Sequence, residues 1–115
     1  MLGSGTSHGV PMIGCDCEVC QSSDPRDRRS RPSILIDLHP GADPLPARTP
    51  ADHRTARHVL VDTSSDLRAQ ALTHNIRRLD AILFTHSHAD HIFGLDEVRR
   101  YNGLQKVGDA FAAAT

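Results

Sequence analysis

Three apolar segments of the chain have the pattern of β-strands. Residues 33–38 and 58–62 are rich in aliphatic and β-branched side chains, and they predict a hairpin whose connection, residues 39–57, is unusually long. Residues 79–85 are almost continuously apolar, which is typical of a strand covered on both faces. The first 14 residues are punctuated by glycine and predict a loop.

A helix is predicted between the second and third of these strands, over residues 66–74. Ser64 or Ser65 can cap its N-terminus, because a serine hydroxyl accepts a hydrogen bond from a free backbone N–H of the first turn. Leu67 and Ala71 are four positions apart and therefore lie on one face, which we expect to pack on the core.

A second, short helix is predicted after the third strand. Apolar residues recur at helical spacing and would face the core, namely Ile92, Leu95, Val98 and Tyr101. Asn102-Gly103 would end the helix. Strands that alternate with helices argue for an α/β architecture, in which a β-sheet carries the two helices.

Composition narrows the class of protein. A chain of 115 residues predicts a single domain, and a net charge of −1 excludes a strongly basic nucleic-acid binder. No apolar run approaches the roughly 18 residues of a membrane span, and the N-terminus lacks the features of a signal peptide. We therefore expect a soluble, cytoplasmic protein without a membrane partner.

Imidazole is abundant, with eight histidines, and the strongest chemical signal lies directly after the third strand. His86 and His88 are two positions apart, so in extended backbone both point to the same side and can bind one ion. Asp90 and His91 follow a turn and can approach a second ion from another direction. Imidazole and carboxylate suit zinc or manganese, and two such ions can share a bridging hydroxide. The alternative, a histidine-rich surface turn that binds nothing, fits this spacing less well.

The three cysteines lie close together, at Cys15, Cys17 and Cys20. Disulfides between residues this close would be strained, and clustered thiols in an intracellular chain more often bind a metal. We expect a structural zinc here, with a reduced, metal-free cluster as the alternative. A structural zinc needs four ligands, and none of the other histidines has an obvious spacing to supply the fourth.

The sequence His86-x-His88-x-Asp90-His91 resembles the signature of the metallo-β-lactamase-fold hydrolases. The glycine-rich loop 3–11, the cysteine cluster and Val61-Asp62-Thr63 are similar to one branch of that superfamily. This branch contains phosphoribosyl 1,2-cyclic phosphate phosphodiesterase and is near the ribonuclease Z group. The resemblance implies an αβ/βα sandwich. Residues 1–106 would form its N-terminal half, and residues 107–115 would form an atypical tail.

The resemblance also implies a role for each motif residue. His86 and His88 would bind the first metal, and Asp90 and His91 the second. Asp90 would also help to orient the nucleophile, and Asp62 would support the site from the second shell. The three cysteines would bind the separate zinc, whose fourth ligand in the phosphodiesterase is a distant histidine. Further catalytic ligands in family members come from beyond the corresponding end of this chain.

These expectations lead to one favoured function and two alternatives. The favoured function is hydrolysis of a small phosphodiester, of the cyclic phosphate type, by a hydroxide that bridges two divalent ions. The alternatives are a catalytically incomplete metal-binding fragment and an RNA-processing relative, although the near-neutral charge does not favour nucleic acid as a partner. Half a sandwich would leave one sheet face uncovered, so a homodimer is also expected.

Overall fold

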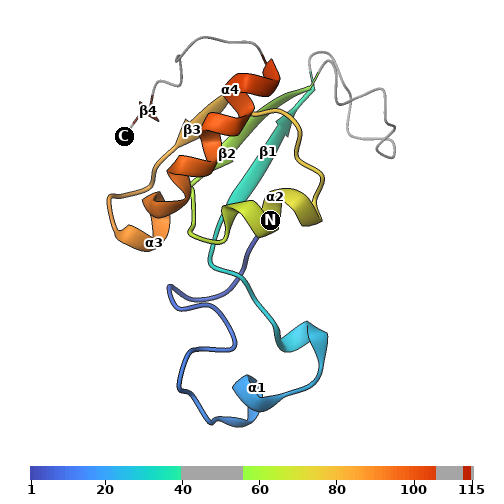
Figure 1. Cartoon of the computed structure of the whole chain (residues 1–115), viewed down its shortest axis with the longest axis vertical. Coiled ribbons are helices and arrows are strands. Elements are labelled where there is room, and N and C mark those ends of the chain that lie inside the picture. The colour runs from blue at the N-terminus through green and yellow to red at the C-terminus, as the bar shows by residue number, and fades with distance from the viewer. Residues whose placement is uncertain (40–55, 106–112, 115) are drawn as a thin grey trace.

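The computed structural model describes residues 1–39, 56–105 and 113–114. Its sheet has the strand order β1-β2-β3-β4 (Figure 1), with β1 at Ile34–Leu38, β2 at Arg57–Val61, β3 at Ala81–Leu83 and β4 at Ala113–Ala114. Strands β1 and β2 are antiparallel, whereas β2, β3 and β4 are parallel. The predicted hairpin of residues 33–38 and 58–62 is confirmed, and most of its connection lies outside the described residues.

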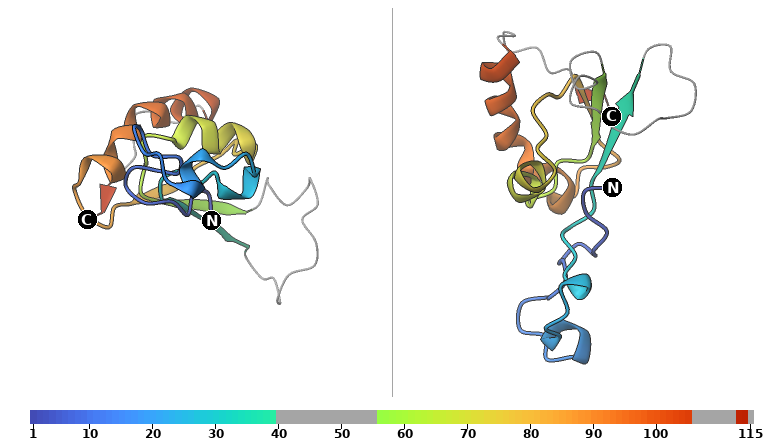
Figure 2. Two further views of the ribbon diagram at one scale, coloured as in Figure 1. Left: turned by 90° about the horizontal axis from the view of Figure 1, so that it is seen from below. Right: turned by 90° about the vertical axis from the view of Figure 1, so that its right-hand side faces the viewer.

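The helices that follow β2 lie on one side of the sheet (Figure 2). Helix α2 spans Leu67–Thr73, and a continuous helical stretch follows β3 as α3 (Ala89–Ile92), a 3-10 helix (Phe93–Val98) and α4 (Arg99–Gln105). Within the described part of the chain, no helix is long and apolar enough to cross a membrane. The predicted α/β architecture is confirmed.

The N-terminal segment extends away from the sheet (Figures 1 and 2). It contains α1 at Glu18–Gln21 and a 3-10 turn at Pro25–Asp27. Two isolated antiparallel bridges, Gly3 with Ser33 and Val10 with Arg29, pair the outgoing part of this segment with its returning part. The predicted loop is therefore held together by backbone hydrogen bonds close to the start of β1.

The hydrophobic core lies between the helices and the sheet face that they cover. Its buried members come from β2, α2, β3 and the helical stretch after β3, and they are Leu60, Leu67, Leu79, Ile82, Val98 and Tyr101. On the opposite sheet face, apolar side chains stay 40–49% exposed, namely Ile34, Ile36, Leu38 and Leu83.

Three of the strand and helix predictions need correction. The segment 79–85 forms only the short strand β3, and its Leu83 is 41% exposed because nothing in the described residues covers that face. Leu95, expected to point inward, is 46% exposed, because the 3-10 helix around it turns by a different angle per residue than an α-helix. Helix α4 also continues through Asn102-Gly103 to its end at Gln105.

The start of α2 differs slightly from the predicted cap. The N-cap position is Asp66, and its carboxylate accepts hydrogen bonds from the Arg31 backbone N–H (2.8 Å) and guanidinium (2.9 Å). The Ser64 hydroxyl accepts the Asp66 N–H at 3.3 Å, and Leu67 N–H donates to the Ser64 carbonyl at 3.0 Å. Ser64 thus orders the turn before the helix, while Asp66 ties the helix to the N-terminal segment.

The separation of residues 1–106 from 107–115 stays a prediction. Of the second range, the structure describes Ala113–Ala114, which form β4 beside β3. The rest of that range lies outside the described residues.

Replacing an aliphatic side chain by alanine should lower the free energy of unfolding more on the covered face of the sheet than on the exposed face. Leu60 is fully buried, so Leu60→Ala should lower the free energy of unfolding by about 2–5 kcal/mol. Ile36 is 40% exposed on the opposite face, so Ile36→Ala should cost no more than about 1 kcal/mol. Urea denaturation of both variants measures the difference. Equal losses would mean that the face carrying Ile36 is covered in solution.

Candidate metal centre

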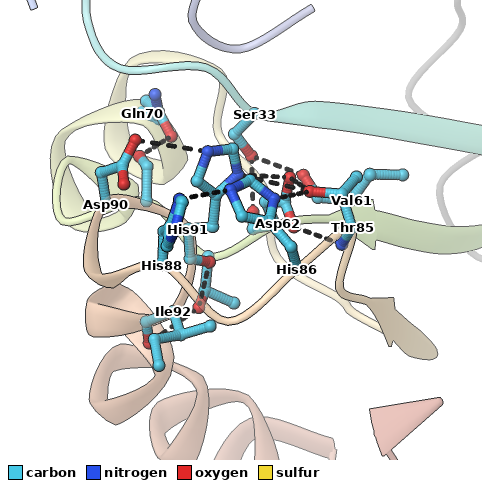
Figure 3. A network of polar contacts seen from close by, with 12 residues as sticks. Ser33, Val61, Asp62, Gln70, Thr85, His86, His88, Asp90, His91 and Ile92 are labelled. Atoms are coloured by element: carbon cyan, nitrogen blue, oxygen red, sulfur yellow. Dashed lines mark hydrogen bonds and ion pairs between the residues drawn. The ribbon is translucent and has the colours of Figure 1, made fainter. Parts of the chain in front are cut away.

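The motif residues gather at one edge of the sheet, where β2 and β3 end (Figure 3). Because β2 and β3 are parallel, their C-terminal ends meet at the same edge. Asp62 follows β2 directly, and its backbone N–H donates to the Leu83 carbonyl of β3 at 2.8 Å. The chain then runs from Thr85 through His86 and His88 into α3, which carries Asp90 and His91.

His86 and His88 present two nitrogen atoms to the same point. His86 Nε2 and His88 Nδ1 are 3.0 Å apart. Two ligand nitrogens at about 2.0–2.1 Å from one tetrahedral zinc are about 3.3 Å apart, so this pair fits a shared ion after a small adjustment. The two side chains therefore converge, as their spacing in the sequence predicted.

Asp90 and His91 form a second pair of ligand atoms. Asp90 Oδ2 lies 3.3 Å from His91 Nε2, which is again the separation of two ligands of one ion. The ring centroids of His86 and His91 are 4.0 Å apart, so the two pairs are neighbours. Two pairs side by side suit two adjacent ions, although each pair supplies only two of the three protein ligands typical of a catalytic zinc.

Asp62 fixes the orientation of His91. Its Oδ2 lies 2.7 Å from His91 Nδ1, and since an ionised carboxylate only accepts, the imidazole carries its proton on Nδ1. The other nitrogen, Nε2, therefore keeps its lone pair for a metal. Burial raises the pKa of Asp62, but the hydrogen bonds from Thr85 and His91 outweigh it, and the net pKa is lowered.

Thr85 is a residue of the site that the sequence analysis did not identify. Its backbone N–H and hydroxyl donate to the two oxygens of Asp62, at 2.8 and 2.7 Å. Its hydroxyl oxygen also lies 3.0 Å from His86 Nδ1. Because the hydroxyl proton is given to Asp62, the oxygen accepts the Nδ1–H of His86, which leaves His86 Nε2 as a ligand atom. Its position directly before His86 was the only signal in the sequence.

Hydrogen bonds of Thr63 and Gly94 hold the loop after β2 against α3 and the 3-10 helix that follows it, and we call these contacts the clamp. The Thr63 N–H donates to the His91 carbonyl at 2.8 Å, its hydroxyl donates to the Ile92 carbonyl at 3.1 Å, and the Gly94 N–H donates to the Thr63 carbonyl at 2.9 Å. A Cβ atom at Gly94 would lie 2.0 Å from the Ser64 carbonyl oxygen. Only glycine permits this approach. The sequence analysis gave a role to neither Thr63 nor Gly94.

The three cysteines form a separate cluster in the N-terminal segment. The sulfur atoms of Cys15, Cys17 and Cys20 all lie within 4.8 Å of one another. Sulfur ligands at about 2.3 Å from one tetrahedral zinc are about 3.8 Å apart, so the cluster fits a zinc ion after a small contraction. The Cys20 N–H and the two neighbouring thiols lower the pKa of Cys17, which favours the thiolate that binds metal. Among the described residues, no fourth ligand joins the cluster.

Known proteins with similar sequences identify the family. The sequence profile of the beta-lactamase superfamily domain matches residues 57–114, half of the chain. The chain belongs to the beta-lactamase superfamily. It is also 50% identical to a new diphosphatase from the PhnP family, whose crystal structure aligns with 95% of this chain at a TM-score of 0.73. The metallo-β-lactamase-type fold and the family resemblance predicted from the motifs are confirmed.

Two further relatives share the fold or part of the sequence. Zinc-bound PqqB from Methylobacterium extorquens aligns with 99% of the chain at a TM-score of 0.60 and 22% identity, which supports the fold alone. A protein of Porphyromonas gingivalis (strain ATCC BAA-308 / W83) called octanoyltransferase is 46% identical over 99 residues, or 86% of this chain.

The chain spans only part of each relative. It corresponds to 17% of the octanoyltransferase, 37% of the PhnP-family diphosphatase and 47% of PqqB. The activity named for a relative therefore need not reside in the part that matches. The superfamily is one of metal-dependent hydrolases, and the ligand roles of the motif residues and cysteines stay predictions.

The contact at Gly94 predicts a large loss of stability on a minimal substitution. Gly94→Ala should destabilise the fold by about 2 kcal/mol or more, because the added methyl group overlaps backbone that cannot move without breaking the clamp. Gly103 is the matched control, since no atom lies within 4 Å of its Cβ position and alanine favours a helix. Thermal unfolding compares the two. A Gly94→Ala variant as stable as Gly103→Ala would contradict the clamp.

The hydrogen bonds of Thr85 predict an effect on metal affinity. Thr85→Val removes the hydroxyl that holds Asp62 and His86, and should weaken metal binding about 10–100-fold. Thr85→Ser keeps the hydroxyl and should restore most of that affinity. Calorimetric titration with zinc measures both variants, with circular dichroism as a control for folding. Equal affinities in the valine and serine variants would show that the hydroxyl does not orient the ligands.

Proposed function

We propose that this chain forms the metal-binding part of a hydrolase that cleaves a small phosphodiester. The observation that carries the proposal is the pair of adjacent ligand sets, His86 with His88 and Asp90 with His91, at the ligand spacing of two neighbouring ions. The 50% identity to a diphosphatase of the PhnP family supports phosphorus as the reacting centre. Zinc and manganese both suit these donors.

Different residues of the chain would have different roles at such a site. Bound divalent ions supply Lewis-acid activation of water and of the phosphoryl oxygens. Asp62 holds the proton of His91 on Nδ1, and Thr85 holds that of His86 on Nδ1, so both rings keep their Nε2 lone pairs outward. The second carboxylate oxygen of Asp90 would accept a hydrogen bond from the attacking water and so orient it.

The proposed substrate is a small molecule, with a cyclic phosphodiester as the favoured class. A diphosphate, as in the name of the PhnP-family relative, is the nearest alternative chemistry. A net charge of −1 does not support nucleic acid, since binding to a phosphate backbone relies on an excess of basic residues. We place the protein in the cytoplasm, where the cysteines would stay reduced and could bind a structural zinc.

A second candidate is that the 115-residue chain binds metal without catalysing a reaction by itself. It is favoured by the observation that each ligand pair in the described residues has two members, whereas a catalytic zinc has three protein ligands. In that case, turnover belongs to a longer protein that contains this chain.

Self-association is a further part of the proposal. The sheet face with Ile34, Ile36 and Leu38 is apolar and 40–49% exposed, and contiguous apolar surface of this kind drives association. A homodimer through this face would shield it. Sedimentation that gives a stable monomer at all concentrations would count against it.

Hydrolysis assays separate these functions. The 115-residue chain, and the longest natural protein containing it, would be loaded with manganese or zinc and given bis(p-nitrophenyl) phosphate, a cyclic phosphodiester, a diphosphate and a thioester. We expect the longer protein to hydrolyse the phosphodiesters and lose about 100-fold or more of that activity in His88→Ala. We expect the chain alone to bind metal weakly with little turnover.

Cys17→Ser is the matched control, because it removes a metal-type side chain at the start of α1, in the segment that extends away from the sheet (Figure 1). It should lower the content of tightly bound zinc and leave hydrolysis largely unchanged. Cleavage of the thioester alone would overturn the phosphodiester assignment.

A further inference from the structure

A cavity of about 320 Å³ lies between α2 and α4, in the layer of helices. None of the motif residues His86, His88, Asp90 and His91 lines it, so it is separate from the metal centre. Sites for small molecules typically have volumes of about 300–1,000 Å³, and this cavity is at the lower end of that range. A ligand that fits it must therefore be small.

Apolar side chains form the floor and part of the rim of this cavity. Leu67 and Tyr101 on the floor are at most 5% exposed, whereas Leu72 and Leu104 at the rim are 66% and 43% exposed. Two exposed leucines beside one cavity leave apolar surface in contact with water. A ligand that covered them would gain from its burial.

Three arginines also line the cavity, Arg68 from α2, Arg77 after α2 and Arg100 from α4. Glu97 is the only acidic residue among the lining residues, so the cavity has an excess of two positive charges. None of these three guanidinium groups forms an ion pair with another of the described residues, although other arginines do. The unpaired positive charge and the apolar floor together select for an anion with an apolar part.

Two of the cavity arginines belong to pairs of consecutive arginines, here called doublets, in which only one member has an ion pair. In Arg77-Arg78, the second arginine donates to Asp80 at 2.8 Å, and in Arg99-Arg100, the first pairs with Asp96 at 3.1 Å. In each doublet, the unpaired member is the one that lines the cavity. The two members of each doublet therefore differ in their surroundings: one has an ion pair, and the other faces the cavity.

We propose that this cavity binds a small amphiphilic carboxylate, with its carboxylate between the arginines and a short aliphatic chain on the floor. A guanidinium group binds a carboxylate through two parallel hydrogen bonds, which suits the charged part. Helices α2 and α4 have seven residues each and are therefore only about 10 Å long. A groove of that length accepts a short acyl chain, whereas a partner helix of several turns would extend beyond it.

Tyr101 gives this proposal a direct spectroscopic test. It is the only tyrosine, and the chain has no tryptophan, so the intrinsic fluorescence comes from the floor of the cavity. Titration with hexanoate should change this fluorescence in a saturable way, with a dissociation constant on the order of 1 mM. Hexanol lacks the charge and acetate lacks the chain, so each should bind at least about tenfold more weakly. Chelator is present throughout, which makes the result independent of the metal centre.

Neighbouring arginines provide the matched variants. Arg100→Gln and Arg77→Gln should each weaken hexanoate binding about tenfold, whereas Arg99→Gln, which removes an exposed pair outside the cavity, should leave it unchanged. Thermal unfolding confirms that the variants are folded. An equal effect of Arg99→Gln and Arg100→Gln would overturn the site, as would fluorescence that does not saturate.

Two other outcomes would replace the proposal with a different ligand class. Binding of acetate or inorganic phosphate as tight as that of hexanoate would show a simple anion site. A fluorescence change with anionic phosphatidylglycerol vesicles but not with hexanoate would show a lipid surface as the partner. Either result contradicts a site for a small amphiphilic carboxylate.

Discussion

The buried carboxylate of Asp62 is the interaction on which the rest of the site depends. It follows β2 in a left-handed backbone conformation (φ 59°), which few residues other than glycine adopt, and this turns its side chain toward β3. There it accepts hydrogen bonds from Thr85 and His91. One carboxylate thus joins the end of β2, the end of β3 and the start of α3. A neutral side chain in its place would leave the Thr85 and His91 donors with weaker partners.

The arrangement explains how the protein itself orients the ligand atoms of His86 and His91. The proton positions of His86 and His91 are set through Thr85 and Asp62, and the backbone of α3 is held by Thr63 and Gly94. The Nε2 atoms of both rings therefore face the site without a metal, 3.0 Å from His88 Nδ1 and 3.3 Å from Asp90 Oδ2. Such preorganisation lowers the cost of binding an ion, because little protein motion has to be lost.

Local sequence patterns were sufficient for β1, β2 and α2, because alternation and helical spacing depend on near neighbours. They were not sufficient for Leu83 and Leu95, since an apolar residue has the same signal whether it packs on the core or stays exposed. The ligand pairs were predicted from spacing within one short motif. Thr63, Thr85 and Gly94 were not, because their roles come from contacts between segments about 6 to 30 residues apart that only the tertiary structure brings together.

The same distinction between local and distant partners applies to charge. Arg78 and Arg99 have an aspartate two or three positions away and pair with it, so their charge is used within their own segment. Arg77 and Arg100 form no ion pair with the described residues, and the packing of α2 beside the helical stretch that ends in α4 brings them to one cavity. The metal centre is built in the opposite way, from ligands that are close in sequence and supports that are distant. At the metal centre, distant partners orient the ligands, whereas at the cavity, the guanidinium groups that form no ion pair with the described residues are the ones available to a ligand.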